Sequence, residues 1–183
     1  AVDTASYAME VLGGNGYVND FVTNRLLRDA QVLPIWEGTS NILSLDLLRA
    51  LDREDAHEPL LALVDERLDG VDHPALADLA DEVHDHYADL GTAMATLATE
   101  DTDYAQSKAK DLATLVFDVV TASLLLAEAQ AEIEREDDAR LAVVADRFVD
   151  RYLRDHDAHG VTDGDRTALE YFDAIVRYDR VAP

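Results

Sequence analysis

The sequence contains no cysteine, and this absence limits its chemistry. Without thiols the chain has no disulfide bond, no thiolate metal ligand and no cysteine nucleophile. A chain that needs no disulfide suits a reducing compartment, so we expect a cytoplasmic protein. Lysine is nearly as scarce, because Lys108 and Lys110 are the only two among the basic residues.

The sequence also lacks the features of a membrane or exported protein. Its longest apolar run, residues 122–129, is broken by Ser123 and Glu128, and it is far shorter than the ~20 residues of a membrane span. The first residues form neither a basic n-region nor an apolar h-region, so no signal peptide is indicated. We therefore expect no membrane partner. The chain opens inside a helical pattern without an initiator Met, so we expect a fragment or an excised domain.

Basic residues are few relative to acidic ones. The chain has 39 Asp and Glu against 15 Lys and Arg, a formal net charge of −24 and a pI of about 4.2. Self-repulsion of this size opposes folding in dilute buffer, and salt screens it. We therefore predict a salt-adapted, halophilic protein, with an ordinary acidic protein as the alternative. Such a surface repels nucleic acid, so we expect DNA not to be a partner.

Convincing strand alternation is also missing, and the pattern that remains is helical. Apolar residues recur at three-and-four spacing, which predicts helices over residues 4–12, 21–29, 40–53, 59–68, 74–99, 102–135, 138–156 and 165–179. The 74–99 segment places one stripe on a single face: Leu76, Leu79, Ala80, Val83, Tyr87, Leu90, Met94 and Leu97. The 102–135 segment does the same with Leu112, Leu115, Val116, Val119, Val120 and Ser123. The fold class is therefore all-α, a helical bundle.

The charged residues 52–58 separate two segments of different composition, and we predict a domain boundary there. Residues 1–53 contain two glycine-bearing motifs, whereas residues 54–183 are plain amphipathic helix. We therefore expect residues 1–53 to form one domain and residues 54–183 to form a helical extension that packs on it.

The histidines predict no metal site. His84 and His86 are two residues apart and therefore point to different faces of a helix. Residues 155–160 resemble the start of a calcium loop, but the twelfth position of that loop is Arg166, where a bidentate Glu is required.

Two short motifs in residues 1–53 are candidates for a functional site. Gly13, Gly14 and Gly16 surround Asn15 and form either a helix-ending turn or a backbone cradle for phosphate. Glu37 stands beside Trp36 at the expected start of a helix. There it is either a carboxylate that complements the helix dipole or a buried general base. Neither motif decides its role alone.

Together these motifs resemble the C-terminal helical domain of acyl-CoA dehydrogenases. The resemblance rests on three pieces in order, EVLGGNGY at residues 10–17, RLLRD at 25–29 and IWEGTSNI at 35–42, with fitting spacing between them. It implies that Glu37 is the catalytic base of α,β-dehydrogenation of an acyl-CoA thioester. It also implies that Thr39 and Asn41 contact FAD, and that Gly13, Gly14 and Gly16 approach the FAD of a neighbouring subunit. The implied assembly is a homodimer or a dimer of dimers.

The sequence departs from the family pattern in three respects. Glu10 stands where many relatives carry Gln, which puts a pyrophosphate contact there in doubt. The N-terminal helical and central β domains that complete the flavin and acyl-CoA sites are not in this chain, so we expect it to be inactive and not to retain FAD alone. The extension resembles that of the alkylation-response flavoprotein subset. The alternatives are therefore a stress-response or DNA-protective module with little dehydrogenase activity, or a structural subunit that pairs with a separate chain.

Overall fold

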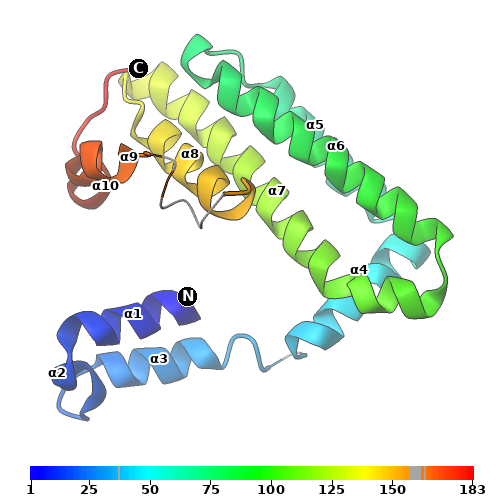
Figure 1. Cartoon of the computed structure of the whole chain (residues 1–183), viewed down its shortest axis with the longest axis horizontal. Helices are drawn as coiled ribbons and strands as arrows, with labels where there is room; N and C mark the ends of the chain where they lie inside the picture. The colour runs from blue at the N-terminus through cyan, green and yellow to red at the C-terminus, as the bar shows by residue number, and fades with distance from the viewer. Residues whose placement is uncertain (37, 157–161, 163) are drawn as a thin grey trace. The chain divides into compact units, whose positions relative to one another are not determined.

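The computed structural model describes residues 1–36, 38–156, 162 and 164–183, and every regular element in them is a helix (Figure 1). The all-α prediction is therefore confirmed. The chain divides into two compact units, residues 1–47 and residues 48–183. The division falls inside one helix, α4 (Ser40–Arg53), a few residues before the predicted boundary. That boundary, with its packing of the extension on residues 1–53, stays a prediction.

The first unit is a helical hairpin with almost no core of its own. It comprises α1 (Val2–Leu12), α2 (Gly14–Tyr17), α3 (Thr23–Gln31) and the first half of α4, and α1 packs along α3. Gly16 and Ser44 are its buried residues among those described. The glycine turn contains one helical turn, α2, where the sequence predicted none. The predicted helix at residues 21–29 begins at Thr23.

The second unit is an antiparallel helical bundle (Figure 1) with a buried hydrophobic core. It contains α5 (His57–Asp69), a 3₁₀ turn η1 (Pro74–Leu76), α6 (Ala77–Thr99), α7 (Thr102–Glu136) and α8 (Arg140–Tyr152). Helices α5, α6 and α8 all pack against α7, which is the central helix of the bundle. Two short helices, α9 (Thr167–Glu170) and α10 (Phe172–Arg177), replace the single helix predicted at residues 165–179.

The two apolar stripes predicted from the sequence form the core of this bundle. Its fully buried members include Leu76, Val83, Leu90, Val119 and Leu126, and the remaining residues of both stripes are buried or pack against them. Helix α7 is long and apolar enough to cross a membrane by length and composition alone. Some of its apolar residues, among them Val119, Ala122 and Leu126, lie in the centre of the bundle.

Polar contacts fasten the turn between α7 and α8 to the end of the chain. Glu132 is buried and accepts hydrogen bonds from the Leu141 N–H at 2.6 Å and from the Arg140 guanidinium at 2.9 Å. Asp138 accepts from the N–H groups of Arg140 and Val181, at 3.0 and 2.9 Å. These donors, Val181 first, hold the pKa of Asp138 below its usual value. The contacts fix residues 179–183 onto the bundle.

Candidate functional site

The predicted base, Glu37, lies outside the described residues, whereas the structure describes the rest of its motif, including Gly38. Gly38 has φ +127°, a conformation that side-chain-bearing residues rarely adopt. A Cβ atom there would also lie 3.4 Å from side-chain atoms of both Ile42 and Leu43. Glycine at this position therefore allows the chain to turn sharply into α4. The sequence contained that signal, since a glycine directly before a helix is a turn signature.

Thr39 and Asn41 lie at the beginning of α4. Thr39 precedes the first helical residue, and its carbonyl accepts the Leu43 N–H at 3.0 Å. Asn41 lies in the first turn, and both residues are exposed. Ser44 is buried one turn further on, and its hydroxyl donates to the Ser40 carbonyl at 2.8 Å. The two predicted flavin contacts are thus on one exposed helix start, where side chains and N–H groups are available to a ligand.

The three glycines of the turn differ in their roles. Gly13 ends α1 with φ +58°, and its N–H donates to the Glu10 carbonyl at 3.0 Å. Gly16 is buried, and a Cβ atom there would stand 2.4 Å from the Met9 carbonyl oxygen. Around Gly13 and Gly14 an added Cβ would meet nothing within 4 Å. Gly16 therefore allows α2 to pack against α1, whereas the space around Gly13 and Gly14 is open.

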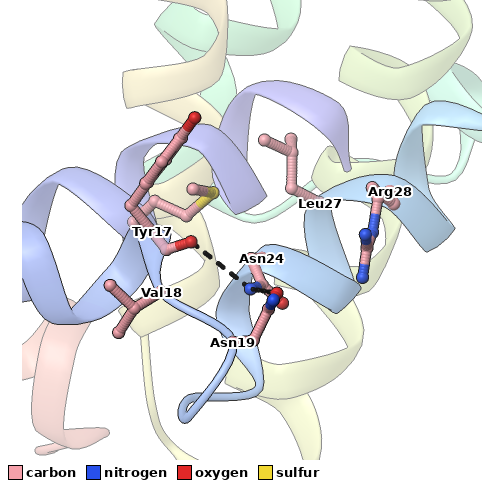
Figure 2. Close-up of a pocket in the computed structure, with 7 residues that line it drawn as sticks. Tyr17, Val18, Asn19, Asn24, Leu27 and Arg28 are labelled. Atoms are coloured by element: carbon pink, nitrogen blue, oxygen red, sulfur yellow. Dashed lines mark hydrogen bonds between the residues drawn. The ribbon is translucent and has the colours of Figure 1, made fainter.

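Two residues at the start of α3, which no sequence motif marks, hold this turn in place. The Thr23 hydroxyl donates to the Gly16 carbonyl at 2.9 Å. The Asn24 amide donates to the Tyr17 carbonyl at 3.3 Å and to the Asn19 side chain at 2.9 Å (Figure 2). Such seven-residue links between a turn and the next helix leave no recognisable pattern in one sequence, so only the structure reveals them.

A hollow of about 590 Å³ lies beside the turn and is lined by Met9, Tyr17, Val18, Asn19, Asn24, Leu27 and Arg28 (Figure 2). Arg28 supplies its positive charge, and it has no ion-pair partner among the described residues of this unit. Thr39 and Asn41 do not line it, and no hydrogen bond between described residues joins them to the glycine turn. The hollow beside the glycine turn and the exposed start of α4 are therefore separate features of residues 1–47.

Comparison with known proteins finds relatives of the first part of the chain. A family model, the C-terminal domain of acyl-CoA dehydrogenases, matches residues 1–51. Acyl-CoA dehydrogenase family member 11 of Caenorhabditis elegans is 53% identical over 55 residues, which are 30% of this chain and 9% of that protein. A segment of 55 residues, 30% of this chain, is 46% identical to mitochondrial isovaleryl-CoA dehydrogenase of Arabidopsis thaliana and covers 13% of that protein.

A bacterial relative gives a similar result. The putative acyl-CoA dehydrogenase AidB of Escherichia coli K12 is 47% identical over 55 residues, 30% of this chain and 10% of that protein. No solved structure matches the chain significantly. The predicted resemblance to the acyl-CoA dehydrogenase family is thus confirmed for residues 1–51. The matched segment is a small fraction of each of these relatives.

Proposed function

We propose that this chain is the C-terminal portion of an FAD-dependent acyl-CoA dehydrogenase-like protein, in which it supplies the catalytic base and part of the flavin and subunit contacts. The observation that carries the proposal is the match of residues 1–51 to the C-terminal domain of that family, with all three motifs in order. The open backbone at Gly13 and Gly14 and the exposed start of α4 support it, because both leave room for a large ligand.

The surface of residues 1–47 supports a role inside a larger protein. Fifteen of its large apolar side chains are exposed, among them Val11 at 86%, Tyr17 at 78% and Trp36 at 58%. An exposed protein surface with this many apolar side chains is typical of a region that another protein surface covers. Charge points the same way, since residues 1–47 carry only 6 of the 39 acids, whereas residues 54–183 carry 32. In a chain whose acids face solvent, the unit with fewer charged residues is the one expected to be enclosed.

In this proposal, Glu37 removes the α-proton of the acyl thioester. Bound FAD would supply the acceptor for the β-hydride. The α-proton is weakly acidic, so its removal needs a thioester carbonyl that is polarised by hydrogen bonds and shielded from water. The backbone N–H of Glu37 is one such donor in the proposed site. Enclosure of Trp36 and Ile35 by the rest of the protein would exclude water from the base and raise its pKa toward a useful range.

The test uses the longer polypeptide that contains this chain, purified with FAD. Addition of an acyl-CoA should bleach the oxidised flavin, because hydride transfer reduces it. This chain alone should elute colourless from gel filtration, since it matches only the C-terminal domain of the family. A flavin that stays oxidised with every acyl-CoA tried, or a yellow fragment, would count against the proposal.

The stress-response alternative is tested on the same polypeptide. Duplex DNA would be titrated at two high salt concentrations, where binding through phosphates weakens as salt rises. The second unit argues against such binding, because residues 48–183 hold 33 acidic and 13 basic residues. Sub-micromolar, salt-sensitive binding would favour the DNA-protective module over the dehydrogenase.

A further inference from the structure

Helix α7 has one face that no described part of the bundle covers. Successive residues on this face are alternately four and three positions apart in the sequence. We call this face the α7 seam: Asp103, Ser107, Lys110, Thr114, Phe117, Thr121, Leu124, Glu128, Ala131 and Arg135. None of these side chains is buried, whereas α5, α6 and α8 pack on the other sides of the helix. An alternating four-and-three repeat is the heptad pattern with which helices pair along a straight seam.

The centre of the α7 seam is unusually apolar for this unit. Phe117 is 65% exposed and Leu124 is 42% exposed. The seam carries no charge between Lys110 and Glu128, although residues 54–183 hold 43 charged side chains. The Thr114 hydroxyl donates to the Lys110 carbonyl of its own helix at 3.0 Å, so it needs no further partner in a contact. An exposed aromatic side chain is typical of the centre of a protein interface when its neighbours are aliphatic or already have their hydrogen bonds.

The charges on the seam identify the partner. If a second α7 runs antiparallel about a twofold axis between Phe117 and Thr121, each position faces a defined position of the other copy. Lys110 then faces Glu128, and Asp103 faces Arg135, each pair occurring twice. The same register sets Phe117 against Thr121 and Thr114 against Leu124. A parallel pair would instead place Lys110 against Lys110 and Glu128 against Glu128, which is repulsive.

The side chains at these positions are available for such pairs. Lys110 and Glu128 have no ion-pair partner among the described residues of the bundle, and both are exposed. Arg135 uses its Nε to donate to the Ala131 carbonyl at 3.1 Å, which leaves the two terminal nitrogens of its guanidinium. A twofold interface needs a surface that is complementary to itself. The α7 seam meets that condition because its heptad spacing, its apolar centre and the order of its charges all match those of an antiparallel second copy.

We propose that the α7 seam is a self-association surface, on which α7 of a second copy of this chain packs antiparallel with Lys110 facing Glu128. The proposal gives the extension a role in assembly and does not depend on dehydrogenase chemistry. It also differs from the subunit contact expected at the glycine turn, because it uses residues 103–135 alone.

The absence of cysteine allows a clean test, since any disulfide must come from an introduced pair. Two single variants of the full chain, Thr114→Cys and Leu124→Cys, would be mixed in molar salt and oxidised gently. Antiparallel pairing predicts mainly disulfides between the two different variants. Parallel pairing predicts disulfides within each variant, because identical positions then face each other. Mainly like-with-like disulfides, or no dimeric disulfide at all, would overturn the proposal.

Surface variants made in the Thr114→Cys and Leu124→Cys chains test the contribution of the apolar centre of the seam. Phe117→Glu should slow formation of the mixed disulfide about tenfold, which corresponds to ~1.4 kcal/mol of lost association. Leu169→Glu is the control, because Leu169 on α9 is 73% exposed outside the seam, and it should leave the rate unchanged. An equal effect of the two variants would overturn the role of the seam.

Charge exchange tests the register. Lys110→Glu in both partners should slow the mixed disulfide about two- to fivefold, as expected from an exposed ion pair of up to ~1 kcal/mol. Adding Glu128→Lys should restore the rate, because each facing pair is again of opposite charge. A double variant that is as slow as Lys110→Glu, or slower, would exclude this register.

Discussion

Gly16 lies against the backbone of Met9, so closely that a Cβ atom on Gly16 would stand 2.4 Å from the Met9 carbonyl oxygen and 2.8 Å from its Cα. The obstacle is backbone, which cannot move aside as a flexible side chain can. This contact holds the glycine turn against α1. It explains one glycine of the turn by packing, and it leaves Gly13 and Gly14 for the proposed approach of the cofactor.

The first prediction follows from this contact. Gly16→Ala should destabilise the α1–α3 hairpin by about 1–3 kcal/mol, the usual effect of overpacking. Gly14→Ala is the matched control and should change stability by less than about 0.5 kcal/mol, because its surroundings are open. Hydrogen exchange of the α1 and α3 amides in the full chain measures both. Similar exchange rates in the two variants would contradict the assigned contact.

The second prediction concerns Arg154, which joins α8 to α6. Its guanidinium donates to both carboxylate oxygens of Glu82, at 2.7 and 2.6 Å, and to Asp146 at 3.0 Å. The hydrogen bond from Arg154 is the first cause that holds the pKa of Glu82 below its usual value. Arg154→Gln should cost about 1–3 kcal/mol at neutral pH, because it leaves a half-buried carboxylate without its charged partner.

The pH dependence follows from the direction of the Glu82 pKa shift. A depressed folded-state pKa stabilises the protein above the unfolded value, and that stability is lost as pH falls through the folded pKa. Arg154→Gln should therefore reduce the loss of melting temperature on acidification below about pH 4.5. Arg177→Gln is the control, since its ion pair with Asp173 is largely exposed. Identical acid profiles for Arg154→Gln and the parent would contradict this assignment.

The third prediction concerns Asp118, a buried carboxylate on α7. It is 7% exposed and has no hydrogen-bond partner among the described residues, and burial raises its pKa. A raised folded-state pKa destabilises the fold above that pKa, and the penalty disappears below the unfolded value near 3.8. Asp118→Asn should therefore raise the melting temperature at pH 7 and should have little effect near pH 3.

Thermal unfolding of Asp118→Asn across that pH range measures this effect. Asp111→Asn is the control, since Asp111 is exposed and pairs with Lys108. A stabilisation by Asp118→Asn that is the same at pH 3 and pH 7 would show that charge burial is not its cause.

The fourth prediction concerns salt. The net charge of −24 should make the fold more stable at about 2 M KCl than at about 0.1 M, because the Debye length falls from ~10 Å to less than ~3 Å. Sucrose at matched osmolality controls for solute exclusion, which also stabilises compact states. A melting temperature that is independent of KCl, or an equal rise in sucrose, would contradict the predicted salt adaptation.

The bundle was predictable from the sequence because its signal is local. Leu76, Val83 and Leu90 recur on one face of α6, and the structure buries all three. The central position of α7 is also implied by its long apolar stripe. The short ends were less predictable: Gly14 to Tyr17 form a helical turn, and residues 165–179 break at Tyr171 into α9 and α10. Tertiary contacts decide such short segments more than helix propensity does.

The candidate site was predictable only in its residue types. The order of the three motifs selects Thr39, Asn41 and the glycines as candidates. The structure places Thr39 and Asn41 at an exposed helix start and buries Gly16. The motifs could not indicate that Gly16 is required by Met9, or that Thr23 holds the Gly16 carbonyl, because both depend on contacts between helices. The α7 seam was likewise invisible, since its pattern becomes meaningful only when the other faces of α7 are known to be covered.

The role of Glu37 is the central claim, and stopped-flow absorbance of the longer polypeptide with bound FAD tests it most directly. Glu37→Gln should bleach the flavin with acyl-CoA about 100- to 10,000-fold more slowly than the parent, the usual contribution of a general base. Glu170→Gln, an exposed change on α9, should bleach as fast as the parent. If Glu37→Gln retains its flavin and also bleaches at the parent rate, Glu37 is not the base.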